Sequence, residues 1–277
     1  MVTVVTDSAA NVPAELVREL DIHVVPMYVT VQDRTFRDGV DISAGELYER
    51  LAVQGRRVST SSPSPEDFAA AFERSGAGPV VCVTVAASMS GTHQQALKAA
   101  EAFDGRVTVV DSSSASMAEG FAAVEAAREA ARGADADAVA ARARDVASSA
   151  RLFATVATFE HLRRSGRVTR LQAYAATALD IKPVFAFRAG EPSAVARPRT
   201  RRRALERVVS ETIGAAGGRR LHLAVIHARA LSDAGTVERA VTAGAQVVER
   251  YVVEVTPVVG AHVGPGLVGT AFYCDPD

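Results

Sequence analysis

The chain has 277 residues, of which 48% are hydrophobic and 23% charged, so it is long enough for about two folded domains and too apolar for a disordered protein. Its 31 Lys and Arg balance its 32 Asp and Glu, which argues against a nucleic-acid partner or a strongly membrane-seeking surface. With only two cysteines, a disulfide scaffold and a cysteine-based metal cluster are excluded, and a reducing cytoplasmic setting fits.

Residues 1–150 alternate between apolar runs and amphipathic, alanine-rich segments, which is the pattern of βαβ units. In chain order we expect strands at 2–6, 24–31, 80–85 and 107–110, and helices at 13–20, after Ser43, and at 66–75, 91–103 and 115–131. Residues 134–150 should form one more helix or a connector. Between them, 32–40 should form a hairpin excursion and 58–65 a polar loop. These elements predict an N-terminal α/β domain over residues 1–150, with a mainly parallel sheet flanked by helices.

From residue 151 the predicted strands become longer and more alternating. We expect strands at 153–156, 182–188, 194–197, 221–227, 247–256 and 270–273, a helix at 158–164 and a turn at Ser165 and Gly166. This pattern indicates a C-terminal α+β domain with a mixed sheet over residues 151–277. No export signal begins the chain, and no stretch approaches the roughly 20 apolar residues that a membrane span needs. We therefore expect a soluble protein whose contact with membranes is at most transient.

Three polar loops fall at predicted strand ends, where ligands of open α/β sheets usually bind. Residues 59–65 cluster hydroxyl groups ahead of a helix, and residues 88–92 place a glycine and further hydroxyls at another helix start. Residues 260–266 form a glycine-rich loop that presents His262. When each feature is taken alone, helix capping or a structural histidine is the more common explanation.

Signatures of common enzymes do not emerge. The stretch 264–269 matches GxGxxG, but too little chain follows it for a dinucleotide-binding unit. We find no Walker lysine motif, no zinc spacing and no nucleophile elbow. Basic residues gather at 163–167 and 197–203, which is compatible with a solvated face or with a docking patch for an acidic partner.

Taken together, these segments resemble the DegV family. The resemblance is carried in family order by Thr6-Asp7-Ser8, Val25-Pro26, Asp38-Gly39, Asp41-Ile42, Thr60-Ser61, Ser90-Gly91-Thr92, Asp111-Ser112, the stretch 162–167, Ile181-Lys182-Pro183, the arginine-rich segment after Ala196, and His262 with Gly264-Pro265-Gly266. It spans nearly the whole chain. It implies a bacterial fatty-acid-binding protein with its ligand tunnel between the two domains. It also implies a non-catalytic, lipid-carrying subunit of a fatty acid kinase, which supplies acyl phosphate for phospholipid synthesis.

The resemblance also assigns residues. The fatty acid head group would be bound by residues of the three loops, namely Thr60, Ser61, Ser90, Gly91, Thr92 and His262. The family's glycine-turn arginine matches Arg167, and its basic strand matches Arg199 and Arg201, near the carboxylate or on the kinase-facing surface. No cofactor or metal is implied.

Two positions depart from the family pattern, and two rival functions stay open. Ser62 stands where Gln is frequent, and His93 stands where Tyr is usual, which should alter head-group contacts and packing under the helix respectively. The first rival is an acyl hydrolase that uses Ser90, His262 and Asp7 as a triad. The second is a binder of small phosphate ligands, because hydroxyl-rich loops also suit phosphate.

Overall fold

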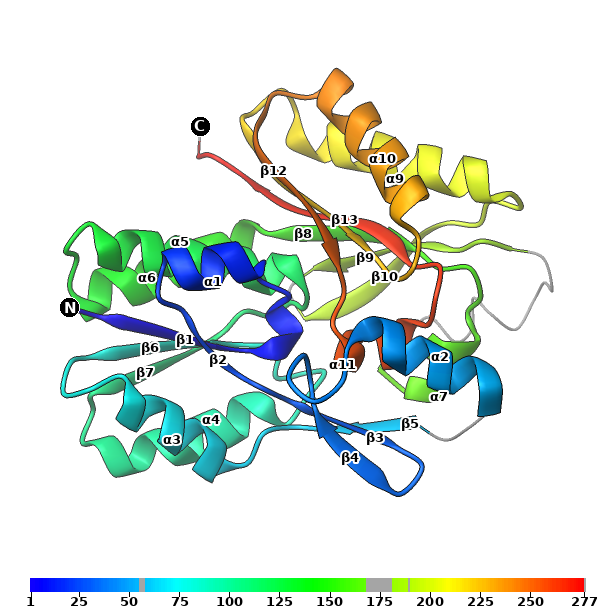
Figure 1. Cartoon of the computed structure of the whole chain (residues 1–277). Coiled ribbons are helices and arrows are strands. Elements are labelled where there is room, and N and C mark those ends of the chain that lie inside the picture. The colour runs from blue at the N-terminus through cyan, green and yellow to red at the C-terminus, as the bar shows by residue number, and fades with distance from the viewer. Residues whose placement is uncertain (55–57, 168–180, 189, 277) are drawn as a thin grey trace.

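The computed structural model describes residues 1–54, 58–167, 181–188 and 190–276, which form three β-sheets with helices around them (Figure 1). A four-stranded sheet and the helices packed on it come from the first half of the chain. A six-stranded sheet comes from the second half, and a small three-stranded sheet lies beside both. The predicted fold class, a parallel α/β part followed by a mixed-sheet part, is confirmed.

The four-stranded sheet is parallel throughout, in the order β2-β1-β6-β7. Its strands are β1 (Thr3–Asp7), β2 (His23–Val25), β6 (Val80–Thr84) and β7 (Val107–Asp111). Helices α3 (Pro65–Arg74) and α4 (Thr92–Ala100) cover one face, whereas α1 (Ala14–Glu19), α5 (Met117–Ala131) and α6 (Ala136–Ser149) cover the other (Figure 1). Short 3-10 turns follow β1 and α4, at Ser8–Ala10 and Glu101–Phe103.

Local sequence explains where these helices begin and which face they bury. Ser64 caps α3 through a capping box with Asp67, and Pro65 occupies the first turn, where a missing N–H costs nothing. Phe68 and Phe72 lie one helical turn apart and are fully buried against the sheet.

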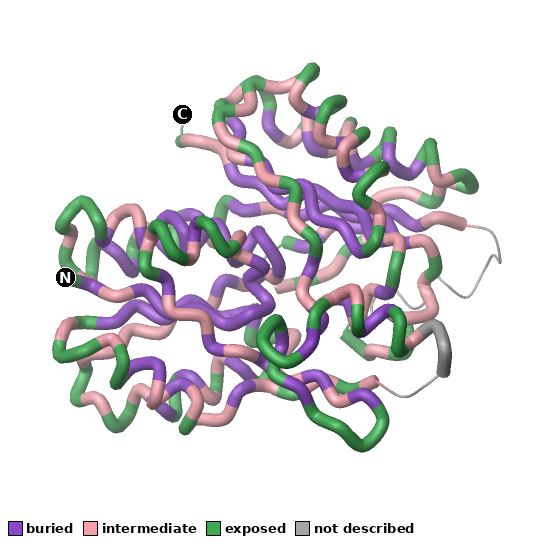
Figure 2. The backbone as a smooth tube through the Cα atoms, in the orientation of Figure 1, coloured by how far each residue is buried: buried purple, intermediate pink, exposed green. Residues whose placement is uncertain are grey.

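The six-stranded sheet is mixed, in the order β10-β9-β8-β13-β11-β12, and only β11 and β12 run parallel to each other. Its strands are β8 (Arg151–Thr155), β9 (Val184–Arg188), β10 (Glu191–Ala196), β11 (Leu221–His227), β12 (Val247–Glu254) and β13 (Val268–Cys274). Helices α9 (Arg201–Ala216) and α10 (Leu231–Gly244) cover the outer face. Figure 2 shows the buried strands in the middle of this layer.

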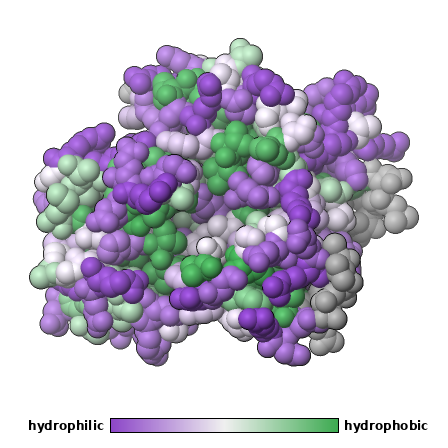
Figure 3. Space-filling view, in the orientation of Figure 1, coloured by the Kyte–Doolittle hydropathy of each residue, from purple (hydrophilic) through white to green (hydrophobic). Residues whose placement is uncertain are grey.

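Helix α5 lies between the two larger sheets and is buried along nearly its whole length. Phe121 packs edge-on against Tyr273 of β13, while the same helix packs on β1 and β6. One apolar core therefore extends from the parallel sheet through α5 to the inner face of the mixed sheet. On the face seen in Figure 3, hydrophobic residues gather toward the middle of the molecule and hydrophilic residues predominate around its edge.

The three-stranded sheet corrects two predictions. The expected strand over 24–31 breaks at Pro26 into β2 and β3 (Tyr28–Val31), which belong to different sheets. The expected polar loop at 58–65 begins as strand β5 (Val58–Ser61). This strand pairs with one edge of β3, and β4 (Arg34–Arg37) pairs with the other edge. Its side chains alternate between half-buried and exposed, so this edge strand lacks the apolar run that marks a strand in sequence. Helix α2 (Ala44–Gln54) begins after Ser43, as predicted.

Two further short helices pack against each other, and one of them corrects a prediction. Helix α7 (Glu160–Ser165) ends at Gly166 in a left-handed conformation, as the turn signal indicated. Residues 257–263, by contrast, form α11 (Pro257–Val263), so most of the predicted glycine-rich loop is helical. Helices α9 and α10 were not predicted. No helix in the described part of the chain combines the length and apolarity required to cross a lipid bilayer.

Candidate functional site

A cavity of about 630 Å³ lies where the three sheets meet. It is bounded by the loops that follow β5 and β6, by α11, and by the inner face of β8 and β9. The polar residues that line it are Thr60, Ser61, Ser62, Ser88, Ser90, Gln94, Ser116, Arg167 and His262. The remaining wall is apolar or glycine, so polar and apolar surfaces meet inside one cavity.

Hydroxyl groups from two loops join at the polar part of the wall. The Ser62 and Ser90 hydroxyls lie 3.2 Å apart, and the Ser90 hydroxyl lies 2.8 Å from that of Thr92. The Thr92 N–H also donates to the Ser90 hydroxyl at 3.3 Å, at the first turn of α4. Gly91 lies beside Ser62, whose hydroxyl would be 3.5 Å from an added Cβ. The cluster therefore presents neutral donors and the positive end of a helix dipole to the cavity.

His262 contributes an uncharged imidazole. It lies in the last turn of α11, and its Nε2 is 2.8 Å from the Thr60 hydroxyl of β5. Burial, with a smaller effect from the Arg167 charge, lowers the pKa of His262 to about 4. The ring is therefore neutral at pH 7 and can donate one hydrogen bond and accept another.

Close packing fixes α11 over the cavity. Gly264 ends the helix with a φ of +71°, and a Cβ at this position would overlap the His161 ring of α7. Only glycine satisfies both the left-handed backbone and the close approach. The apolar residues Val258, Val259 and Val263 of the same helix line the cavity beside His262.

One side of the apolar wall comes from the mixed sheet. Leu152 and Phe187 face each other across β8 and β9, and Phe185 and Ala154 form the next facing pair. All four line the cavity, together with Ile226, Leu162, Leu267, Met27, Met89, Val85, Ala9, Ala87 and Ala115. Strand alternation directs the side chains on β8 and β9 and that of Ile226 on β11 inward, toward the core shared with α5.

The structure brings most of the predicted site residues together. Thr60, Ser61, Ser90, Gly91, Arg167 and His262 all line the cavity. Thr92 is fully buried and does not line the cavity itself. It contacts the Ser90 hydroxyl, which does. Arg199 and Arg201 lie outside the cavity lining, and the prediction that they belong to a strand is wrong. Arg199 precedes the Thr200 cap, and Arg201 begins α9, where it forms an ion pair with Asp233 at 2.8 Å.

The two departures from the family pattern have separate consequences. Ser62 lines the cavity and contacts Ser90, so it is a site residue that the sequence-based assignment left out. His93 points away, with its Nδ1 3.0 Å from the Thr84 hydroxyl under α4. Ser88 and Gln94 also line the cavity, and only their proximity to Ser90 in the sequence pointed to them.

The three residues of the hydrolase hypothesis use different partners. Ser90 bonds with Ser62 and Thr92, whereas His262 bonds with Thr60. Asp7 accepts from the N–H groups of Ala9 and Val85 and lines a separate cavity, of about 220 Å³. Burial raises the pKa of Asp7 to about 6.

Comparison with known proteins identifies the family to which the chain belongs. A model of the DegV family, described as uncharacterised protein of that family, matches residues 1–275. The chain belongs to the DegV family. A DegV domain-containing protein of Streptomyces coelicolor is 36% identical over 273 residues, which cover 97% of this chain and 96% of the relative.

Solved structures of DegV proteins have the same fold. A DegV family protein from Thermus thermophilus, described by its fatty acid binding, aligns with a TM-score of 0.94 and 32% identity over 99% of both chains. DegV from Bacillus subtilis, described as a fatty acid binding protein, aligns with a TM-score of 0.89 and 27% identity over 99% of both chains.

Proposed function

We propose that this DegV protein binds a long-chain fatty acid in the central cavity and presents its carboxylate to the catalytic subunit of a fatty acid kinase. The kinase transfers phosphate from ATP to the carboxylate, and this chain supplies the bound substrate without performing the chemistry. The observation that carries the proposal is the cavity itself, in which a mostly apolar wall meets a cluster of hydroxyls and a neutral imidazole.

The apolar wall suits an acyl chain. At roughly 0.8 kcal/mol per buried methylene, a chain of about 16 carbons gains on the order of 12 kcal/mol gross before the costs of association. That gain requires enclosure, and side chains from the mixed sheet, from α11 and from the loops that follow β1 and β6 surround the cavity. The same wall argues against the rival of a small phosphate ligand, which has no apolar part to bury.

The polar part of the cavity suits a carboxylate that must remain reactive. The hydroxyls of Thr60 and Ser90 and the His262 ring are neutral donors, so they hold an anion without neutralising it in a tight ion pair. Arg167 also lines the cavity and supplies one positive charge nearby. In this proposal Thr60, Ser61, Ser62, Ser90, Gly91 and His262 bind the head group, with Thr92 orienting Ser90.

The kinase-facing surface is proposed to include the start of α9. Arg202 is 80% exposed there, and Arg199 is also exposed, whereas Arg201 is held by Asp233. Exposed arginines suit an acidic or phosphate-bearing partner. We further propose that the domain boundary lies at residue 150, between α6 and β8, and that the protein works in the cytoplasm, where the kinase has access to ATP.

Native mass spectrometry of freshly purified protein tests lipid binding directly. We expect a mass increment equal to one long-chain fatty acid, removed by organic extraction. Wild-type protein with a partner kinase and ATP should then yield acyl phosphate, and Ser90→Ala and His262→Ala should lower the yield. Ser59→Ala is a matched control, because Ser59 is exposed on the same strand as Thr60. Unchanged yields in both site variants would refute the head-group assignment.

A chromogenic ester distinguishes the hydrolase alternative. The proposal expects no turnover by the purified protein. Turnover that disappears in Ser90→Ala and persists in Ser59→Ala would instead establish Ser90 as a nucleophile.

A further inference from the structure

Three arginines line a third cavity at the start of β8, which has the same volume of about 220 Å³ as the cavity beside Asp7 but is distinct from it. Arg151 begins β8, Arg188 ends β9, and Arg219 follows the C-terminus of α9. Ser148, Ser149, Ala215, Phe272 and Cys274 complete the lining. The cavity has several times the roughly 30 Å³ that one water molecule occupies, so it accommodates a polyatomic ligand.

The three arginines lie close to one another and have few acidic partners among the described residues. None of the three forms an ion pair with a carboxylate there, and the nearby Asp275 is engaged by Arg220 and His222. Burial, followed by the charges of Arg188 and Arg219, lowers the pKa of Arg151, although the group stays charged at neutral pH. Like charges that repel each other around a cavity are an unfavourable arrangement that a bound anion relieves.

Hydrogen bonds hold the guanidinium group of Arg219, and the strand register brings Arg151 and Arg188 together. Arg219 donates from Nε to the Ala216 carbonyl at 3.2 Å and from Nη2 to the Ala215 carbonyl at 3.3 Å. Leu152 faces Phe187 in the register of β8 and β9, which sets Arg151 and Arg188 next to that pair, at the same end of the two strands. The Ser148 and Ser149 hydroxyls donate to carbonyls of α6, so the arginines are the main donors toward the cavity.

We propose that this cavity binds a phosphate group, either of a soluble phosphate monoester or of a phospholipid head group. Phosphate carries roughly two negative charges at neutral pH and offers three oxygens in a tetrahedral arrangement. Guanidinium groups from three separate elements suit such a group better than a planar carboxylate, for which one bidentate arginine suffices.

The proposed phosphate site lies on the opposite face of the mixed sheet from the central cavity. Arg151 and Arg188 line the phosphate cavity, whereas their chain neighbours Leu152 and Phe187 line the central one. The inference does not rest on the proposed lipid function, because it uses only the charges and geometry of the cavity lined by the three arginines.

Calorimetric titration of the full chain with glycerol phosphate at low ionic strength tests the proposal. We expect saturable binding that weakens with added chloride, as charge-assisted binding requires. Arg151→Gln and Arg188→Gln should each weaken it about tenfold or more. Arg74→Gln, an exposed position on α3 with the same change in charge, should leave it unchanged. A parallel arm measures sedimentation with vesicles of phosphatidic acid and, for comparison, of phosphatidylcholine.

Each outcome decides the matter. Binding of the soluble ester, or of phosphatidic acid vesicles alone, that is lost in both site variants supports the site and identifies the source of the phosphate. An unchanged melting temperature in Arg188→Gln, whose side chain is exposed, shows that lost binding is not lost folding. The proposal is overturned by the absence of saturable binding in both arms, or by binding that both site variants retain.

Discussion

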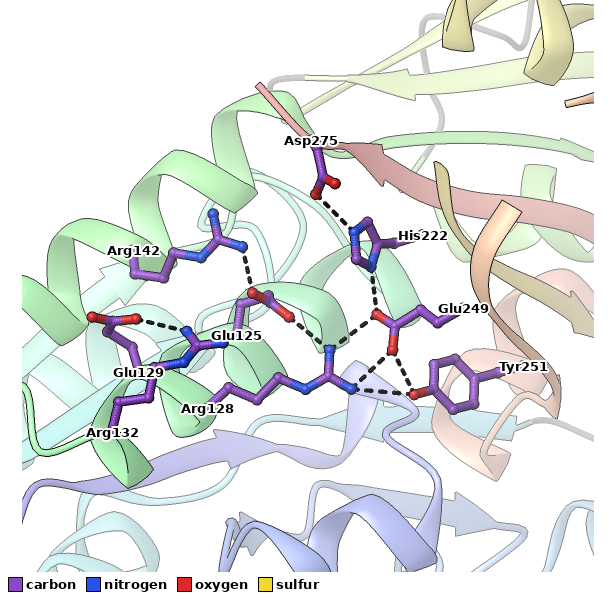
Figure 4. A network of polar contacts seen from close by, with 9 residues as sticks. All are labelled: Glu125, Arg128, Glu129, Arg132, Arg142, His222, Glu249, Tyr251 and Asp275. Carbon is purple, nitrogen blue, oxygen red and sulfur yellow. Dashed lines mark hydrogen bonds and ion pairs between the residues drawn. The ribbon is translucent and has the colours of Figure 1, made fainter. Parts of the chain in front are cut away.

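Removing the charge of Glu249 should destabilise the protein in a pH-dependent manner, because this side chain joins the two halves of the chain (Figure 4). Glu249 of β12 accepts two hydrogen bonds from Arg128 of α5, at 3.0 and 2.8 Å. It also accepts from the Tyr251 hydroxyl at 2.9 Å and lies 2.7 Å from Nδ1 of His222. The perturbation is Glu249→Gln, which keeps the shape of the side chain and removes its charge.

The pKa of Glu249 sets the magnitude. Burial raises this pKa, but the hydrogen bonds from His222 and Arg128 outweigh burial, so it falls from 4.5 to about 2. At about 1.4 kcal/mol per pH unit, the drop corresponds to roughly 3 kcal/mol of folding free energy. Because the folded-state pKa is the lower one, this stabilisation is present above pH 4.5 and is lost as the pH falls toward 2.

Urea denaturation at pH 7 and at successively lower pH measures the effect. We expect Glu249→Gln to lose roughly 3 kcal/mol at pH 7, and the gap to wild type to close below pH 4.5. Glu206→Gln is the matched control: its ion pair with Arg202 is on the surface, with side chains 57% and 80% exposed, so it should lose less than about 1 kcal/mol. Equal losses in the two variants, or a loss for Glu249→Gln that does not change with pH, would refute the reasoning.

Three further results are expected. Gly264→Ala should lower the free energy of unfolding by about 2 kcal/mol or more in thermal melts, because its Cβ would overlap the His161 ring. Gly105→Ala, at a similar φ of +77° but in open space, should lower it by only about 1 kcal/mol. Equal losses would mean that backbone strain alone, without the His161 contact, destabilises Gly264→Ala. Arg202→Glu should weaken kinase docking and spare lipid retention, and loss of lipid would instead place Arg202 in the binding site or the fold. Lipid retention should not vary between pH 5.5 and 8, because the pKa of His262, lowered to about 4, keeps the ring neutral throughout; a change near pH 6.5 would contradict this.

Sequence patterns were sufficient where local chemistry determines the structure. Strand β11 begins and ends at the predicted residues, because an apolar run buried on both faces needs no context to be recognised. Ser43 and Gly166 marked helix ends through capping, which is a property of a few neighbouring residues. Helix α9 was missed although Ala204, Leu205 and Val208 have helical spacing, because the arginines around them suggested a surface cluster.

What the sequence determined by itself was therefore the alternation of elements, the fold class and the three polar segments that contain Thr60, Ser90 and His262. Only the tertiary structure decided which of those residues meet. Strand β5 pairs with β3, α11 packs against α2 and α7, and these long-range contacts bring Thr60 within 2.8 Å of His262, 202 positions away in the chain. The packing of α9 on the outer face of the mixed sheet likewise leaves Arg201 outside the cavity lining. Such contacts depend on the packing of whole elements, which no local propensity specifies.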